Sequence, residues 1–165
     1  MVSCAFTRKE ERRFRDLLSL GLQGATVLEA GYWQEMSQEN VETVRRFFDR
    51  WNRGDREIRA DEVDPELELH SQIMGGVVRG VDGLQAWFLE IEQQFEEWQQ
   101  HIAEVRELDR DRLLVIGEIH LRGRGSKVEF DQPMAWLMDF RDGRLLRLET
   151  FVHRSEALDA AGLQD

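Results

Sequence analysis

Cysteine, proline, lysine and long apolar runs are all scarce in this chain of 165 residues. Cys4 is the only cysteine, which excludes an intrachain disulfide and a zinc site built from several thiolates. No apolar run approaches the roughly 20 residues that a membrane-spanning helix needs. The first residues, MVSCAFTRKEERRFRDLL, place charges where a signal peptide has its apolar segment. We therefore expect a cytoplasmic protein with no membrane partner.

Positive charge is also in short supply. The chain has 22 basic and 33 acidic residues, a formal net charge of -11, and lysine occurs only at positions 9 and 127. Nucleic acids are bound through clustered cations, so no nucleic-acid partner is expected. Hydrophobic residues make up 41% of the chain, which is typical of a globular protein, and the length fits one domain.

The start of the folded domain is predicted near residue 36. In MSQENVETVRRFFDRWNRGD, Ser37 is a candidate helix N-cap. Apolar side chains follow at helical spacing, at Val41, Val44, Phe47, Phe48 and Trp51. Residues 1–35 have no comparable period and are predicted to form a weakly ordered N-terminal extension, with the domain over residues 36–165.

The remaining chain changes from a helical period to a period of two. A strand is expected over residues 67–71, and a helix opened by Asp82 and Gln85 as a capping box. The predicted apolar stripe of that helix is Leu84, Trp87, Phe88, Ile91, Phe95 and Trp98. Strands are expected near residues 100–108, 112–122, 127–140 and 144–153, then a short helix capped by Ser155. This order predicts an α+β fold, in which a curved, mostly antiparallel sheet wraps around helices to form a cone.

Four segments together resemble the SnoaL-like proteins of the nuclear transport factor 2-like superfamily: MSQENVETVRRFFDRWNRGD, VVRGVDGLQAWF, DFRDGRLLRLETF and RSEALDAAGL. The resemblance covers residues 36–163. It implies a cone with an apolar pocket and a homodimer formed through the outer face of the sheet. It does not choose a function, because the superfamily includes isomerases, cyclases, dehydratases, hydrolases and non-catalytic members.

The resemblance also allows the roles of a ketosteroid isomerase to be tested residue by residue. The oxyanion tyrosine of that enzyme falls on Phe47, its acidic strand donor on Trp136, and its base on His70 or Ser71. Two of these roles are chemically absent, so that mechanism is not expected. His70 is the candidate general base, since its ordinary pKa suits proton transfer near neutral pH. The alternative is a solvated histidine, because alternation with Leu67 and Leu69 would turn it outward.

The strand over residues 127–140 carries an unusual inward face of Phe130, Gln132, Met134, Trp136, Met138 and Phe140. Methionine adapts to irregular cavities, and tryptophan needs a partner for its N–H group. We expect this face to oppose the helices and to form a ligand pocket. The predicted pocket residues are Phe47, Trp51, Trp87, Ile91, Gln132, Met134, Trp136, Met138 and Thr150. Pro133 indicates a bulge or an edge position in this strand.

Other polar clusters are assigned to the surface. Glu118, His120, Glu149 and His153 share the outward phase with interleaved arginines, which favours cross-strand ion pairs or dimer contacts over a metal site. No metal-binding motif is present, and nothing in the sequence indicates a cofactor.

Three functions remain open from the sequence. The leading hypothesis is a homodimer that binds a small, mainly apolar molecule in the cone. The second is an enzyme of the cyclase, isomerase or hydrolase type, with His70 as base and Gln132 or Trp136 as donor. The third is a dimerisation or partner-binding module whose core is filled by its own side chains.

Overall fold

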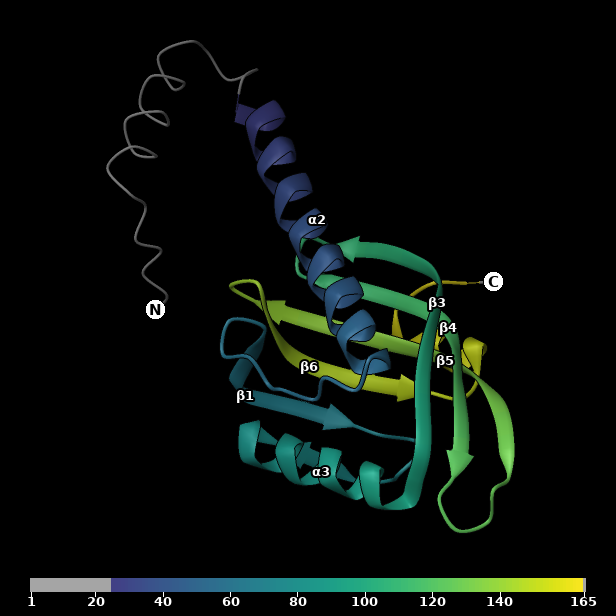
Figure 1. Cartoon of the computed structure of the whole chain (residues 1–165). Helices are drawn as coiled ribbons and strands as arrows, with labels where there is room; N and C mark the ends of the chain where they lie inside the picture. The colour runs from purple at the N-terminus through teal and green to yellow at the C-terminus, as the bar shows by residue number, and fades with distance from the viewer. Residues whose placement is uncertain (1–24, 165) are drawn as a thin grey trace. The chain divides into compact units, whose positions relative to one another are not determined.

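The computed structural model describes residues 25–164. The helices are α2 (Ala25–Asn52), α3 (Gly80–Gln94) and α4 (Arg154–Ala160). The strands are β1 (Val63–His70), β2 (Val77–Arg79), β3 (Phe95–Asp109), β4 (Arg112–Gly123), β5 (Glu129–Arg141) and β6 (Arg144–Phe151). They form one open sheet in the order β2-β1-β6-β5-β4-β3 (Figure 1). All neighbouring pairs are antiparallel except β1 with β6, so the predicted α+β cone is confirmed.

Helix α2 begins earlier than the sequence predicts. It starts at Ala25, so Ser37 lies inside the helix and is not its N-cap. The Ser37 hydroxyl instead donates a hydrogen bond to the Glu107 carboxylate, and the Asn40 amide donates to the Arg110 carbonyl at 3.1 Å. Both side chains are buried. The polar residues that resemble a helix start are therefore contacts between α2 and the end of the β3–β4 hairpin. The predicted weakly ordered extension falls mainly on residues outside the described part and stays a prediction.

Helix α3 is shorter at its end than predicted. The residue before it, Arg79, makes no side-chain cap, and Asp82 lies within the first turn, so the predicted capping box is wrong. The helix ends at Gln94, which places Phe95 and Trp98 on strand β3. Trp98 is buried on β3, and an apolar residue of the predicted helical stripe is also expected to be buried. Its apolar character therefore could not distinguish a last helical turn from the first residues of a strand.

The two faces of the sheet are covered by different helices. The main core packs α2 and α3 against the inner face, with Phe48, Phe88 and Trp136 among its buried residues. On the outer face, Ala157 and Leu158 of α4 pack with buried side chains of β4, β5 and β6. The predicted homodimer through the outer face stays a prediction, and α4 occupies the apolar part of that face. Ser155 lies within α4, and the residue at its N-cap, His153, makes no side-chain cap, so the predicted Ser155 cap is wrong.

Pro133 occupies the edge position that the sequence predicts as one of two alternatives. It pairs with Glu118 of β4, while the pairing of β5 with β6 begins only at Ala135. On the side away from β4, Pro133 therefore has no neighbouring strand, and its lack of a backbone N–H group costs no hydrogen bond there.

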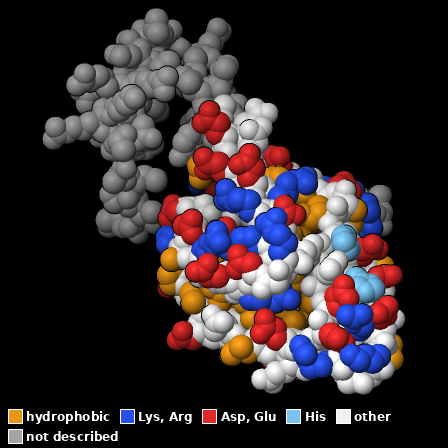
Figure 2. All heavy atoms as spheres, in the orientation of Figure 1, with side chains coloured by type: hydrophobic (Ala, Val, Ile, Leu, Met, Phe, Trp, Pro, Cys, Tyr) orange, Lys and Arg blue, Asp and Glu red, His pale blue; other side chains and the backbone are white. Residues whose placement is uncertain are grey.

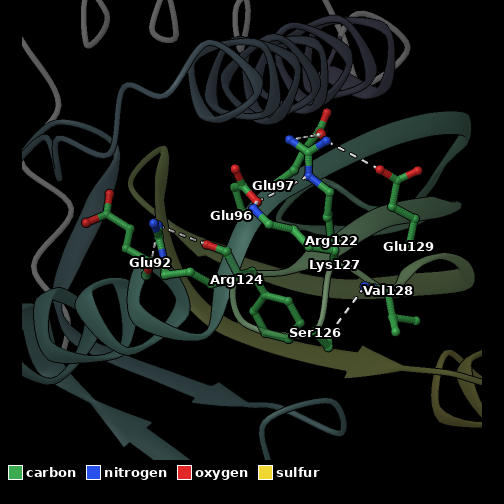
Figure 3. A network of polar contacts seen from close by, with 10 residues as sticks. Glu92, Glu96, Glu97, Arg122, Arg124, Ser126, Lys127, Val128 and Glu129 are labelled. Atoms are coloured by element: carbon green, nitrogen blue, oxygen red, sulfur yellow. Dashed lines mark hydrogen bonds and ion pairs between the residues drawn. The ribbon is translucent and has the colours of Figure 1, made fainter.

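The RGRGS segment is a hairpin turn between β4 and β5, as predicted. Arg122 at the end of β4 lies between carboxylates of both neighbouring strands, 3.3 Å from Glu97 and 3.3 Å from Glu129 (Figure 3). Arg124 donates two hydrogen bonds to the Glu92 carbonyl, at 2.7 and 3.0 Å. Because the last carbonyls of a helix lack intrahelical partners, Arg124 both caps α3 and fixes the hairpin to it.

Charged side chains of both signs are interleaved over the surface seen in Figure 2. On the outer sheet face, His120 of β4 contacts Asp131 of β5 at 2.8 Å, which agrees with the predicted cross-strand ion pairs. Arg147 contacts Glu149 at 2.8 Å, but both residues lie on β6. Within residues 25–164, no helix is both long enough and apolar enough to cross a lipid bilayer.

Candidate functional site: a cavity inside the cone

A cavity lies between the inner face of the sheet and helices α2 and α3. The space within it that admits the centre of a water-sized sphere is about 70 Å³. Helix α2 contributes Phe47, Phe48 and Trp51 to its wall, and α3 contributes Trp87 and Phe88. These side chains line the cavity because the apolar stripe of each helix turns toward the sheet.

Strand β5 forms much of the opposite wall. Met134, Trp136 and Met138 line the cavity and are each at least 96% buried. Alternation along the strand brings these three residues to the inner face. The Trp136 ring meets Phe48 of α2 edge to face, with ring centroids 5.1 Å apart. Aromatic rings from a helix and a strand therefore enclose the space from both sides.

Most of the predicted pocket residues meet around one space. Phe47, Trp51, Trp87, Met134, Trp136, Met138 and Thr150 all line the cavity.

Ile91 and Gln132 are not among the lining residues. Ile91 is buried in the core. Gln132 is half-buried, and its amide donates to the Pro133 carbonyl at 3.0 Å. The wall ends at Met134 because β5 then extends past β6, and Phe130 is 46% exposed. The prediction therefore extended the inward face of β5 too far toward the start of the strand.

His70 does not face the cavity. Its neighbours Leu69 and Ser71 line the space, whereas the His70 imidazole contacts the Glu68 carboxylate at 2.5 Å and is 34% exposed. Strand alternation turns His70 to the opposite face from Leu69, which is the alternative left open by the sequence. The candidate base is thus outside the site.

Glu62 is the one ionisable side chain among the lining residues of the described chain. Arg50 donates a hydrogen bond to its carboxylate, and both side chains are buried. Among residues 25–164, no group of three His, Cys, Asp or Glu side chains is arranged to hold a metal ion.

The sequence analysis missed several polar lining residues, including Glu62, Ser71 and Gln100. Ser71 follows Leu67 and Leu69 in strict alternation, so its inward position was available from the pattern. Gln100 shares its strand phase with Trp98, but that signal was lost when Trp98 was assigned to a helix. Glu62 lies before β1, and no periodic pattern of residues indicated that its side chain faces the cavity.

Three indole N–H groups in this region, those of Trp87, Trp98 and Trp136, lack partners among the described residues. Trp51 donates to the Trp98 carbonyl at 3.0 Å, but the buried Nε1 atoms of Trp87 and Trp98 make no hydrogen bond. The two rings pack edge to face at 6.1 Å. An unpaired buried donor costs free energy, which the aromatic packing of these rings offsets in part.

Comparisons with known proteins agree with this architecture. Residues 44–148 match the SnoaL-like domain family. No curated protein gives a significant match.

Many solved structures share the fold, and three of them are 16–20% identical to this chain. An NTF2-like protein of unknown function from Burkholderia pseudomallei is 20% identical, with a TM-score of 0.63 over 73% of this chain and 95% of that chain. TerC, co-crystallised with polyporic acid, is 18% identical, with a TM-score of 0.62 over 75% of this chain and 98% of that chain. A hypothetical protein from Catenulispora acidiphila with a ketosteroid isomerase-like fold, in complex with trimethylamine, is 16% identical, with a TM-score of 0.58 over 74% and 94%. By its match over residues 44–148 and by its six-stranded α+β cone, the chain belongs to the SnoaL-like family.

Proposed function

We infer that this protein binds a small, mainly apolar molecule in the cavity between α2, α3 and the inner face of the sheet. The observation that carries the proposal is this cavity, whose wall is formed mainly by aromatic, aliphatic and methionine side chains. Small-molecule sites are concave, mainly apolar and supplied with a few polar groups.

The polar groups of the cavity are few and buried. Thr150 and Ser71 are each 6% exposed and Gln100 is 9% exposed. The Gln100 side-chain amide makes no hydrogen bond to a described residue, whereas the Gln100 backbone bonds with the Asn52 side chain. Such a group gains a partner when a ligand with a donor or an acceptor enters.

Two structural relatives support a binding role. TerC was co-crystallised with polyporic acid, and the Catenulispora acidiphila protein is in complex with trimethylamine. Both are small organic compounds held by proteins of this fold. Their identities with this chain are 18% and 16%, so the ligand of this chain has to be found by experiment.

Native mass spectrometry of the protein purified from its natural host tests the proposal. We expect a second mass above that of the 19.4 kDa chain, which disappears after denaturation and yields one small, mainly apolar compound. A chain that carries no such compound, and that takes up none from an extract of the same host, would contradict the proposal.

Trp136→Ala is expected to weaken binding of the probe 2-ethylnaphthalene about tenfold, since roughly 50 Å² of apolar contact is lost at about 25 cal/mol per Å². The dissociation constant can be measured by NMR titration. Phe130→Ala is the matched control, because Phe130 shares the strand and the residue parity of Trp136 but is 46% exposed and lies outside the cavity. Equal losses in the two variants would remove Trp136 from the binding site.

A further inference from the structure

One row of polar side chains on the cavity wall joins strands β5 and β6 to the residue that follows β1. Trp136 of β5 is the cross-strand partner of Thr150 of β6. On the other side of β6, His70 pairs with Glu149, so the next residues, Ser71 and Thr150, come level. Ser71, Thr150 and Trp136 all line the cavity and are at least 94% buried. We call these three residues the donor row.

The oxygen atom of each hydroxyl group in the donor row already accepts one hydrogen bond. The backbone N–H of Met74 donates to the Ser71 oxygen at 3.1 Å, and that of Gln72 donates to the Thr150 oxygen at 3.0 Å. Neither hydroxyl donates to a described residue. Their oxygens are thus held in place by backbone contacts, while their hydrogens remain available to a ligand.

The third member of the donor row can only donate. The indole N–H of Trp136 makes no hydrogen bond to a described residue, and its ring is positioned by Phe48. Trp51 differs, because its indole N–H donates a hydrogen bond to the Trp98 carbonyl. Three neighbouring donors without acceptors belong to side chains that line this mainly apolar cavity, so the complementary ligand group is an acceptor oxygen.

The charge of the wall selects among acceptor groups. No lysine, arginine or histidine of the described residues lines the cavity, so a carboxylate or a phosphate would be buried without a counter-ion. Glu62 would attract a cation, but Arg50 already pairs with it. An uncharged acceptor fits these surroundings best.

We propose that the donor row is the recognition subsite for an uncharged carbonyl group on an apolar ligand. This inference rests on the proposed binding function and specifies the ligand class: a neutral ketone, aldehyde, ester or amide with an apolar body. The apolar body would occupy the space beside Met134 and Met138, and the carbonyl oxygen would accept hydrogen bonds from the donor row.

A set of four probes with one naphthalene body tests the subsite. The probes are 2-acetylnaphthalene, 2-ethylnaphthalene, 2-naphthoate and 1-(2-naphthyl)ethylamine. We expect the ketone to bind at least about 10-fold more tightly than the hydrocarbon, since each net hydrogen bond contributes about 1 kcal/mol. The anion and the cation should bind more weakly than the ketone.

Variants of the donor row separate recognition from folding, because the ratio of ketone to hydrocarbon affinity is the readout. Thr150→Val and Trp136→Phe should each lower that ratio about fivefold, for the loss of one hydrogen bond of about 1 kcal/mol. The hydrocarbon affinity should stay within about twofold, the experimental scatter expected for a change of under 0.5 kcal/mol. Ser155→Ala is the control, since Ser155 is exposed on α4 and does not line the cavity, and it should leave the ratio unchanged.

The outcomes distinguish the inference from the proposed function. Binding of ketone and hydrocarbon with equal affinity would overturn the subsite and keep the cavity as a binding site. Tighter binding of naphthoate or of the amine would overturn the choice of an uncharged group. Failure of all four probes to bind would contradict the proposed function, and the subsite with it.

Discussion

Replacing Gly117 with alanine is expected to destabilise the protein by about 3 kcal/mol, at the upper end of the usual cost of forcing an extra methyl group into a packed interior. Gly117 of β4 lies opposite an irregularity in β3, where the pairing register shifts between Ile102 and Glu104. A Cβ atom at Gly117 would lie 1.9 Å from the His101 carbonyl oxygen and 3.3 Å from the Ala103 nitrogen. Both obstacles are backbone atoms, which cannot rotate away as a side chain can.

The measurement is thermal or denaturant unfolding of the variant. A loss of about 3 kcal/mol corresponds to a fall in Tm of roughly 6–12 °C for a domain of this size. Gly125→Ala is the control, since its Cβ would meet no atom within 4 Å and its backbone carries no positive φ. The usual effect of Gly→Ala inside a strand is stabilisation. A Gly117→Ala variant as stable as Gly125→Ala would therefore show that the bend of β3 does not depend on this glycine.

The second large effect is expected at Arg141→Met. Asp64 of β1 is 1% exposed, and Arg141 at the end of β5 donates two hydrogen bonds to its carboxylate, at 2.6 and 3.0 Å. Removing the arginine leaves a buried carboxylate without its cation, which costs about 3 kcal/mol. Because the Arg141 side chain is itself 44% exposed, the loss should lie at the lower end of the range for buried pairs. Arg147→Met is the control, since its ion pair with Glu149 is on the outer surface and should be worth less than about 1 kcal/mol.

The effect of Arg141→Met should depend on pH. Hydrogen bonds from Arg141 hold the pKa of Asp64 below its ordinary value, against the opposing effect of burial, with a further contribution from the backbone N–H of Glu66. A carboxyl group with a lowered folded-state pKa stabilises the fold above its unfolded pKa, and this contribution is lost as the pH falls through the folded pKa. The difference in unfolding free energy between wild type and variant should thus be constant near neutral pH and shrink below about pH 4. A difference that persists unchanged to pH 2 would assign the effect to packing of the arginine stem.

The sequence predicted the architecture well because the spacing of apolar residues along each segment follows the face that is buried. The stripes of α2 and α3 and the alternation of β4, β5 and β6 marked the inner face, and the resemblance arranged these elements into a cone. The wrong predictions concern residue types that occur in two different structural settings. Ser37 and Asn40 resemble a helix start but make contacts with residues about 70 positions away, and Trp98 continues a helical stripe from a strand.

The candidate site was predicted in part. Met134, Trp136 and Met138 line the cavity as expected, but strand parity could not show where the wall ends, so Gln132 was included. The donor row depends on the lateral register of β1, β6 and β5, in which β1 and β6 are parallel and distant in sequence. The pattern of residues within one segment does not indicate how that segment is aligned with a distant strand. The sequence therefore could not place Ser71 beside Thr150.

The most direct test of a ligand-binding hollow behind β5 is NMR titration of the protein labelled at its methionine methyl groups. Met134 and Met138 line the cavity, whereas Met36 and Met74 do not. On addition of 2-ethylnaphthalene, the aromatic ring should shift the methyl signals of Met134 and Met138 in a saturable way and leave that of Met36 unchanged. Saturation with no shift at Met134 and Met138, or shifts confined to Met36 and Met74, would show that the space between the helices and the sheet does not bind such a molecule.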